Sequence, residues 1–355
     1  MRPQTHCVGS WSERASRWGN WGWFVSLLLI GSACGKPSKP AEPPPSPTPA
    51  ENAEPPAVLL NAPAPPVLIR DVGFASPESA LYDPVADLYL ISNVNGGLMD
   101  ADGNGFISRL APDGTVMDLK WIAGGTSNVT LDAPKGMALV GDTLFVADVN
   151  VVRSFDRKSG QPLGKVAIVS ASFLNDVAAA PDNTLYVSDS GFANVKGLSV
   201  PQKNGADTIY TLDARGVVGV LVKGAELGQP NGLLADAEGV WVANLAGQIL
   251  RVSKQGQQKV VATLPPGLDG LALTEAGKLI VSSWQTSTVY AGSPPGFAAP
   301  GGVSAPGGDA ASPGAFEPAI ADLESPGDLT YDPKRHQLVV PLFKQNAVYI
   351  QQIMP

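Results

Sequence analysis

The sequence predicts an all-β fold, a six-bladed β-propeller, over residues 67–355. One observation is composition, because 39 Gly and 33 Pro among 355 residues indicate many turns. A second is a repeat of about 48 residues, the length of a four-stranded blade, in which a loop with Pro or Asn leads through an apolar run and an Asp or Gly turn to a strand. A third is that no long amphipathic helical pattern interrupts the repeats.

The repeat occurs six times, and its clearest part is a β-rich run that ends in a small or polar residue. These runs are Leu88–Ser92, Thr143–Asp148, Leu185–Asp189, Val240–Asn244, Leu279–Ser282 and Leu338–Pro341. The last unit has room for only three strands, whereas the apolar segment Val67–Val72 has no unit of its own. We therefore expect this N-terminal strand to complete the sixth blade and close the ring, which removes open sheet edges.

One segment interrupts the fifth unit. Residues 291–318 hold 7 Gly and 6 Pro in 28 residues and few strand formers. Such a composition predicts a disordered Gly/Pro/Ala insertion.

The first 33 residues have the pattern of an export signal. Three Arg residues precede the apolar run Trp21–Ile30, which is too short to span a bilayer, and small residues then lead to Cys34. This pattern resembles a bacterial lipoprotein signal, in which the Cys is acylated and becomes the mature N-terminus, although Gly31 stands where that pattern usually has Leu. The alternative is a plain cleavable signal with a chance Cys.

Residues 34–66 are then an acylated Cys and a Pro-rich disordered linker. There are 12 Pro and no aromatic residue among the 32 residues from 35 to 66, so this segment cannot bury a core. We expect an exported protein that Cys34 anchors to membrane lipid in the bacterial cell envelope, at the outer membrane or the periplasmic face. Because Cys7 leaves with the signal, no disulfide is available.

Charge and residue inventory exclude several functions. A net charge of −8 and a pI near 4.8, without a basic cluster, argue against nucleic-acid binding, and we expect a monomer that acts on a small molecule. After the signal, the single His is His336, in what looks like a solvated turn. Serine or cysteine hydrolysis through a His base and His-ligated zinc therefore have almost nothing to build on. Oxygen ligands, which suit hard ions such as Ca²⁺ or Mg²⁺, remain.

The repeat register places one residue from each blade at the same level of the central channel. These residues are Glu78, Lys135, Asn175, Asn231, Asp269 and Gly327. A buried polar group without a partner costs about 1 to 3 kcal/mol, so four in register favour a bound cation. The alternative is that they cap strand ends through backbone hydrogen bonds.

At these residues the chain resembles the senescence marker protein/gluconolactonase (regucalcin-like) family of six-bladed propellers. The resemblance implies one divalent metal ion, Ca²⁺, Mg²⁺, Mn²⁺ or Zn²⁺, held by Glu78, Asn175, Asn231 and Asp269. It also implies that Asp269 takes a proton from the attacking water and that the substrate is a sugar lactone. The chain would thus be a metal-dependent hydrolase of the lactonase or esterase type. Each dipeptide motif alone is weak, and their order and register carry the likeness.

Lys135 departs from the family pattern. A cation at this level either repels the metal or points away and holds an anionic group of the substrate. Specificity is expected from loops after the second strands, which contain Asn95, Asp148, Asp189, Asn244, Trp284 and Lys344. Among these we predict Asp189 and Trp284 as substrate contacts, with packing within the blades as the alternative for Trp284.

A second oxygen-rich stretch begins at Asp100. Asp100, Asp102 and Asn104 match the start of an EF-hand loop, but Ala111 stands where that loop has its Glu. A second, structural Ca²⁺ and a plain hairpin turn are both open here.

The rival to the hydrolase is a non-catalytic, lipid-anchored propeller in which a structural metal stiffens the channel and the surface binds a ligand or partner. A strictosidine synthase-like propeller would need an amine-condensing site, for which the sequence gives no sign.

Overall fold

The computed structural model describes residues 64–126, 128–194, 201–294 and 315–353. The predicted signal, Cys34 and the linker up to residue 63 lie outside these ranges.

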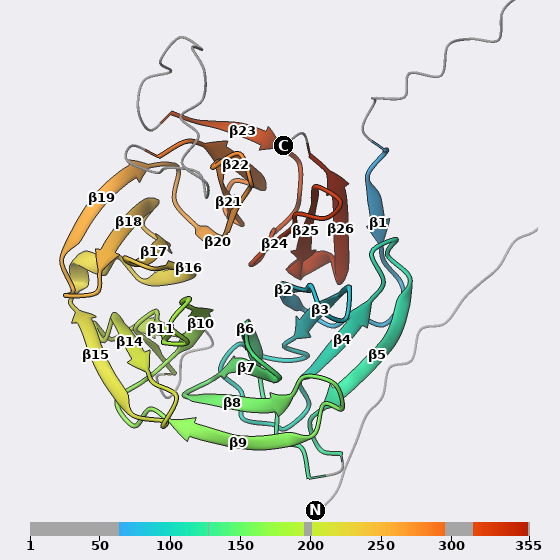
Figure 1. Ribbon diagram of the computed structural model, residues 1–355, viewed down its shortest axis with the longest axis horizontal. Helices are drawn as coiled ribbons and strands as arrows, with labels where there is room; N and C mark the ends of the chain where they lie inside the picture. Colours follow the sequence, from blue (N-terminus) through green and yellow to red (C-terminus); the bar gives the residue numbers. More distant parts are fainter. Residues whose placement is uncertain (1–63, 127, 195–200, 295–314, 354–355) are drawn as a thin grey trace, which may run out of the picture. The chain divides into compact units, whose positions relative to one another are not determined.

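The described residues form six four-stranded antiparallel sheets arranged as blades of a ring (Figure 1). Blade 1 consists of β2 (Pro77–Asp83), β3 (Leu88–Asn93), β4 (Phe106–Leu110) and β5 (Val116–Ala123). Blade 2 consists of β6 (Pro134–Val140), β7 (Thr143–Asp148), β8 (Val151–Asp156) and β9 (Pro162–Ala167). Blade 3 consists of β10 (Leu174–Ala179), β11 (Leu185–Asp189), β14 (Thr208–Leu212) and β15 (Val218–Lys223). Blade 4 consists of β16 (Pro230–Asp236), β17 (Gly239–Asn244), β18 (Gln248–Ser253) and β19 (Gln258–Thr263). Blade 5 is β20 (Leu268–Leu273), β21 (Leu279–Ser283), β22 (Thr288–Gly292), β23 (Phe316–Ile320).

The sixth blade joins the two ends of the propeller, as predicted. It consists of β24 (Thr330–Asp332), β25 (Gln337–Leu342), β26 (Ala347–Gln352) and, from the start of the propeller, β1 (Val67–Ile69). β1 pairs antiparallel with β26, Val67 opposite Ile350. The strand is shorter than the predicted segment, because it ends at Ile69 and residues 71–73 form a bend. The all-β, six-bladed fold is confirmed, and the part of the chain that the structure describes holds no α-helix, only the 3₁₀ turns η1 (Ala225–Leu227) and η2 (Phe343–Gln345).

The core is divided among the six contacts between neighbouring blades. Each contact has its own cluster of buried apolar side chains, and the cluster between blades 6 and 1 contains Ile69, Tyr89 and Val339. The second strand of a blade packs against both neighbours, so β3 is buried along its whole length, whereas the outer strand β9 is mostly exposed. Burial on both faces explains why the second strands are the most continuously apolar parts of the repeat.

Two further features of the chain bear on the predictions. Residues 291–292 end β22 and residues 316–318 open β23, so both ends of the predicted insertion belong to strands. This corrects the predicted boundaries, and residues 295–314 lie outside the described residues. No helix in the described ranges is long and apolar enough to cross a membrane.

Candidate metal and substrate site

A β-bulge recurs at the start of the innermost strand in five blades. In β2, Pro77 lies opposite Asn93 and Ala80 opposite Ile91, so the two residues Glu78 and Ser79 oppose a single residue of β3. The same shift occurs at the second and third residues of β6, β10, β16 and β20. Because a bulge re-aims the side chains at its position, the second residue of each strand faces the channel.

Serines of the second strands hold three of these bulges in place. The Oγ atoms of Ser92, Ser188 and Ser282 accept the N–H of the third residue of β2, β10 and β20, each at 2.9 Å. Ser188 also donates to the carbonyl of Asn231 in the next blade at 2.7 Å, and Ser282 donates to that of Gly327 at 2.7 Å. The innermost strands are therefore tied to one another around the channel.

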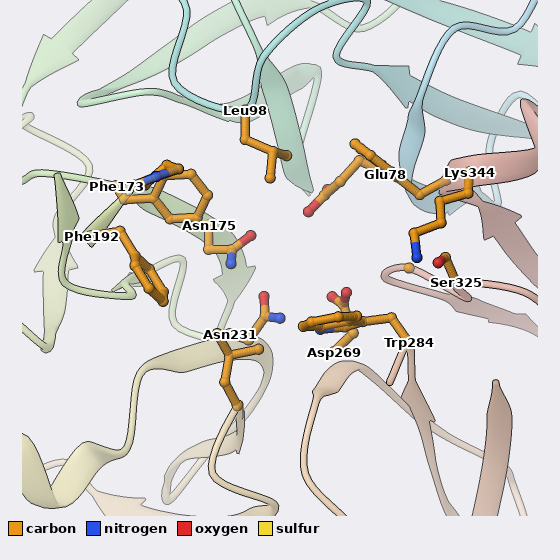
Figure 2. Close-up of a pocket in the computed structure, with 14 residues that line it drawn as sticks. Glu78, Leu98, Phe173, Asn175, Phe192, Asn231, Asp269, Trp284, Ser325 and Lys344 are labelled. Atoms are coloured by element: carbon orange, nitrogen blue, oxygen red, sulfur yellow. The ribbon is translucent and has the colours of Figure 1, made fainter. Parts of the chain in front are cut away.

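The bulges bring the four predicted ligands together. We call Glu78, Asn175, Asn231 and Asp269 the polar ring; all four line one pocket of about 330 Å³, and Figure 2 shows their polar ends converging on a common space. Each is 4–8% exposed. Residues from four separate blades thus meet at one point, as their register predicted.

The polar ring leaves oxygen atoms without partners. Glu78 Oε2 and Asp269 Oδ1 are buried and accept no hydrogen bond from the described residues. The amide of Asn175 donates to Ser190 Oγ at 3.1 Å, and that of Asn231 donates to the carbonyl of Leu268 at 3.2 Å. Since both amide nitrogens are engaged, the amide oxygens are the atoms left for a ligand.

The electrostatics of the polar ring also favour a cation. Burial, followed by the charge of Asp269, raises the pKa of Glu78 well above its ordinary value, although Lys135 opposes this. Burial, followed by the charge of Asp176, raises the pKa of Asp269 to about 8. Both carboxylates are thus poorly compensated by the protein itself, and a divalent cation at the ring would stabilise their charged forms.

Two carboxylates that the sequence analysis did not single out lie at the next level of the channel. Asp176 accepts the backbone N–H groups of Val177 and Leu233, each at 2.6 Å, and burial raises its pKa to about 7. Asp328 accepts the hydroxyl of Ser79 at 2.5 Å, and burial raises its pKa well above the ordinary value. The signal was present in the sequence, because Asp176 follows Asn175 and Asp328 follows Gly327, and both preceding residues belong to the six register positions of the repeat.

Lys135 does not line the pocket. Its side chain is fully buried and is not among the pocket-lining residues; its Nζ donates to the carbonyl of Ala133 at 2.8 Å and lies 4.9 Å from the centre of the Phe173 ring. Burial lowers its pKa, and the charge of Glu78 opposes that effect. The prediction of a substrate contact at Lys135 is corrected: the residue is a buried counter-charge beside the ring.

Asp189, the second predicted substrate contact, is also a buried structural residue. Its carboxylate accepts hydrogen bonds from the backbone N–H groups of Ser172, Phe173 and Gly191 at 2.9 to 3.0 Å. It therefore fixes the loop before β10, a role that Asp148 plays before β6. Trp284, by contrast, lines the pocket and is 40% exposed, which fits the predicted contact.

The predicted calcium loop is held by its own hydrogen bonds. Asn104 donates from its side-chain amide to Asp102 Oδ2 at 2.7 Å and from its backbone to Asp102 Oδ1 at 3.2 Å. Asp100 accepts the N–H of Gly97 at 3.1 Å. These contacts are those of a hydrogen-bonded turn, the alternative considered above, and a second Ca²⁺ stays a prediction.

Within the described ranges, no three His, Cys, Asp or Glu side chains gather closely enough to form a metal cluster. The polar ring has two carboxylates and two amides, so its fit rests on donor chemistry. Two buried carboxylate oxygens without partners, with two amide oxygens beside them, suit one hard divalent ion.

Loops supply the rest of the pocket, and they are mainly apolar. The residues that line it above the polar ring are Leu98, Phe173, Phe192, Pro201, Leu245, Trp284, Ser325, Gly327, Phe343 and Lys344. Phe192 lies on β12 (Phe192–Ala193), which pairs with β13 (Gln202–Lys203) in a small extra sheet of blade 3. The sequence analysis did not predict Phe173 or Phe192 as pocket residues, since the repeat does not extend into these loops.

No family model matches this chain, and no curated protein does. Solved structures do resemble it. One, named as that of a "putative gluconolactonase", has a TM-score of 0.55 at 17% identity, covering 82% of this chain and 93% of that one. The luciferin-regenerating enzyme has a TM-score of 0.56 at 13% identity, covering 82% and 96%. At such identities the likeness concerns the fold, and by fold this chain is a propeller similar to these two proteins.

Proposed function

We propose that the pocket is a hydrolytic site for a small ester or lactone, in which the polar ring holds one divalent cation. The observation that supports this most is the pair of buried, unpartnered oxygens of Glu78 and Asp269 at the base of an open pocket. A protein does not leave such atoms unanswered without cost, which is about 1 to 3 kcal/mol for each.

The donor set suits Ca²⁺, Mg²⁺ or Mn²⁺, and Zn²⁺ less well, because it contains no nitrogen or sulfur ligand. When bound, such an ion polarises a carbonyl group and lowers the pKa of water. Lys135 and the carboxylates of Asp176 and Asp328 set the field around the ring.

Asp269 is the proton acceptor in this proposal. Its carboxylate takes a proton from water as the water oxygen bonds to the ester carbon. The ester C–O bond then breaks, and the same proton passes to the departing alkoxide, so that acid and alcohol, or a hydroxy acid from a lactone, are formed.

The rival function is a propeller whose cation serves stability alone. All four ring residues line the pocket and are not sealed beneath other side chains, which favours the hydrolase, because a ligand then has access to the ring. A panel of lactones and aryl esters, assayed with added Ca²⁺, Mg²⁺ or Mn²⁺ and again with chelator, separates the two functions. Chelator-sensitive turnover that Asp269→Asn abolishes supports the hydrolase, whereas thermal destabilisation by chelator without turnover supports the rival. Asp142→Asn, an exposed change in blade 2, is the control.

We also propose that the signal and linker deliver this propeller to the cell envelope on a lipid anchor at Cys34. Labelling with a radioactive fatty acid and membrane fractionation test this. Cys34→Ala is expected to lose the label and to leave the membrane fraction, and an unlabelled wild type would contradict the anchor.

A further inference from the structure

We infer that the substrate has a flat, largely apolar body and carries an anionic group that pairs with Lys344, in place of the polyhydroxylated sugar lactone that the family resemblance implies. This inference rests on the proposed function only in placing the reacting carbonyl at the polar ring.

The walls of the pocket above the ring are mainly apolar. Phe173 and Phe192 meet edge to face on one side, with ring centres 5.9 Å apart at 80°, and Trp284 lies across the pocket from them (Figure 2). Leu98 and Leu245 add aliphatic surface. Aromatic pairs of this geometry bind flat apolar groups through both area and edge-to-face contact.

A sugar would be poorly served by these walls. Of the described residues that line the pocket above the ring, only Ser325, Lys344 and the indole N–H of Trp284 offer a hydrogen-bonding group from a side chain. Each hydroxyl that loses water without gaining a partner weakens binding, so walls with few hydrogen-bonding groups disfavour a substrate with four or more hydroxyls. An aryl or acyl ester meets no such cost.

Lys344 is a cation without a protein counter-charge at the pocket. Lys344 is exposed, and among the described residues its ammonium has no hydrogen-bond or ion-pair partner; it shares this with the exposed Lys259, but only Lys344 lines the pocket. Figure 2 shows its side chain extending into the pocket beside Ser325. An anionic substituent of the substrate is the partner that this position lacks.

The turn that carries Lys344 is held from both sides. The N–H of Phe343 donates to the carbonyl of Ser325 at 3.0 Å, and the side chain of Asn346 accepts the N–H of Ser76 from blade 1 at 2.7 Å. Asn346 itself ends η2 in the left-handed conformation, which Asn tolerates. Because the turn is fixed before binding, the ammonium is offered with little ordering cost beyond its own side chain.

The volume agrees with a compact aromatic ester. A pocket of about 330 Å³ lies at the lower end of the range for small-molecule sites, which suits a substituted single ring.

The test uses matched substrates. We would compare 4-acetoxybenzoate, its neutral counterpart 4-acetoxybenzamide, and glucono-δ-lactone, with the protein supplied with divalent cation. The inference predicts a higher kcat/KM for the anionic aryl ester than for either alternative. Lys344→Gln should lower kcat/KM for the anionic ester, mainly through KM, about five- to tenfold more than it lowers kcat/KM for the neutral ester. Lys344→Glu should invert the preference between the two aryl esters. Lys259→Gln, an exposed Lys on β19, is the control.

A binding measurement separates this inference from the proposed function. Quenching of Trp284 fluorescence by 4-acetamidobenzoate, whose amide resists hydrolysis, reports occupancy whether or not the protein turns over esters, and Trp284→Phe should remove the signal. Quenching that weakens in Lys344→Gln supports the inference even if no ester is hydrolysed. The absence of ester hydrolysis would contradict the proposed hydrolase function but not this inference. Preference for gluconolactone, or aryl-anion binding that Lys344→Gln does not weaken, would overturn it.

Discussion

Two buried carboxylates, Asp148 and Asp269, show how this propeller divides its polar residues between structure and a site. Asp148, at the end of β7, accepts the N–H groups of Asp132 and Ala133 and pairs with the guanidinium of Arg153. Asp269, near the start of β20, has one buried oxygen without a partner and no cation of the protein in its immediate contacts. Asp148 therefore has its hydrogen bonds and its counter-charge within the fold. Asp269 lacks both at one oxygen, and a ligand is needed to supply them.

The largest expected effect distinguishes these two residues by function. Asp269→Asn removes both the proton acceptor and one carboxylate ligand, so hydrolysis should fall at least about 1,000-fold while the circular dichroism spectrum is kept. Asp148→Asn should retain per-molecule activity wherever the protein remains folded. Full turnover by Asp269→Asn would remove Asp269 from the mechanism.

The next effect concerns stability and has the opposite order. Asp148→Asn removes one of the two carboxylates that pair with Arg153 and weakens the hydrogen bonds from the Asp132 and Ala133 N–H groups, which should cost about 1 to 3 kcal/mol in urea unfolding. Asp269→Asn, measured without cation, should unfold at equal or higher urea concentration than wild type, because it removes a buried carboxyl group whose ionised form no protein cation compensates. If both variants lost the same stability, the proposed division would be wrong.

Close packing under the ring gives a third prediction. A Cβ on Gly136 would lie 1.8 Å from Asp176 Oδ1 and 2.6 Å from its Cα, so Gly136→Ala must displace the backbone of blade 3. We expect a loss of about 1 to 3 kcal/mol and weaker cation binding. Gly164→Ala on β9, where the nearest atom is 3.6 Å away, should be neutral. Equal melting temperatures for the two variants would show that the channel is looser than described.

The pH dependence of stability gives the smallest contrast. In the folded, cation-free protein Asp269 has a pKa of about 8 and Asp176 of about 7, against 3.8 for an ordinary Asp. The folded state therefore holds protons that the unfolded chain releases, and stability should fall as pH rises from about 4 to about 8. Saturating divalent cation should flatten this slope. A stability that rises with pH in the cation-free protein would contradict the raised pKa values.

Much of this could be predicted from the sequence because the repeat is cyclic. Six equivalent units fix six equivalent strand starts, and the channel then brings Glu78, Asn175, Asn231 and Asp269 together without any knowledge of contacts. The closing strand followed from arithmetic on the last unit. The bulge that aims these side chains was not predictable, because it depends on which residues pair across two strands.

The errors have a common physical cause. Their place in the repeat predicts substrate contacts for Asp189 and Lys135. Both side chains are instead buried and hydrogen-bonded to backbone groups. The aromatic pair Phe173 and Phe192 lies in loops outside the repeat, where register gives no guidance. The roles of loop residues therefore could not be predicted from the repeat.

The central claim is that the polar ring binds one divalent cation, and calorimetric titration of Ca²⁺, Mg²⁺ and Mn²⁺ into chelator-treated protein tests it most directly. The account predicts one polar-ring site per chain in the wild type and in Asp142→Asn, apart from any Ca²⁺ at the Asp100 loop, which the ring variants would not affect. It predicts no such site in the double variant Glu78→Gln and Asp269→Asn. Absence of binding by the folded wild type, or equal binding by the double variant, would contradict it.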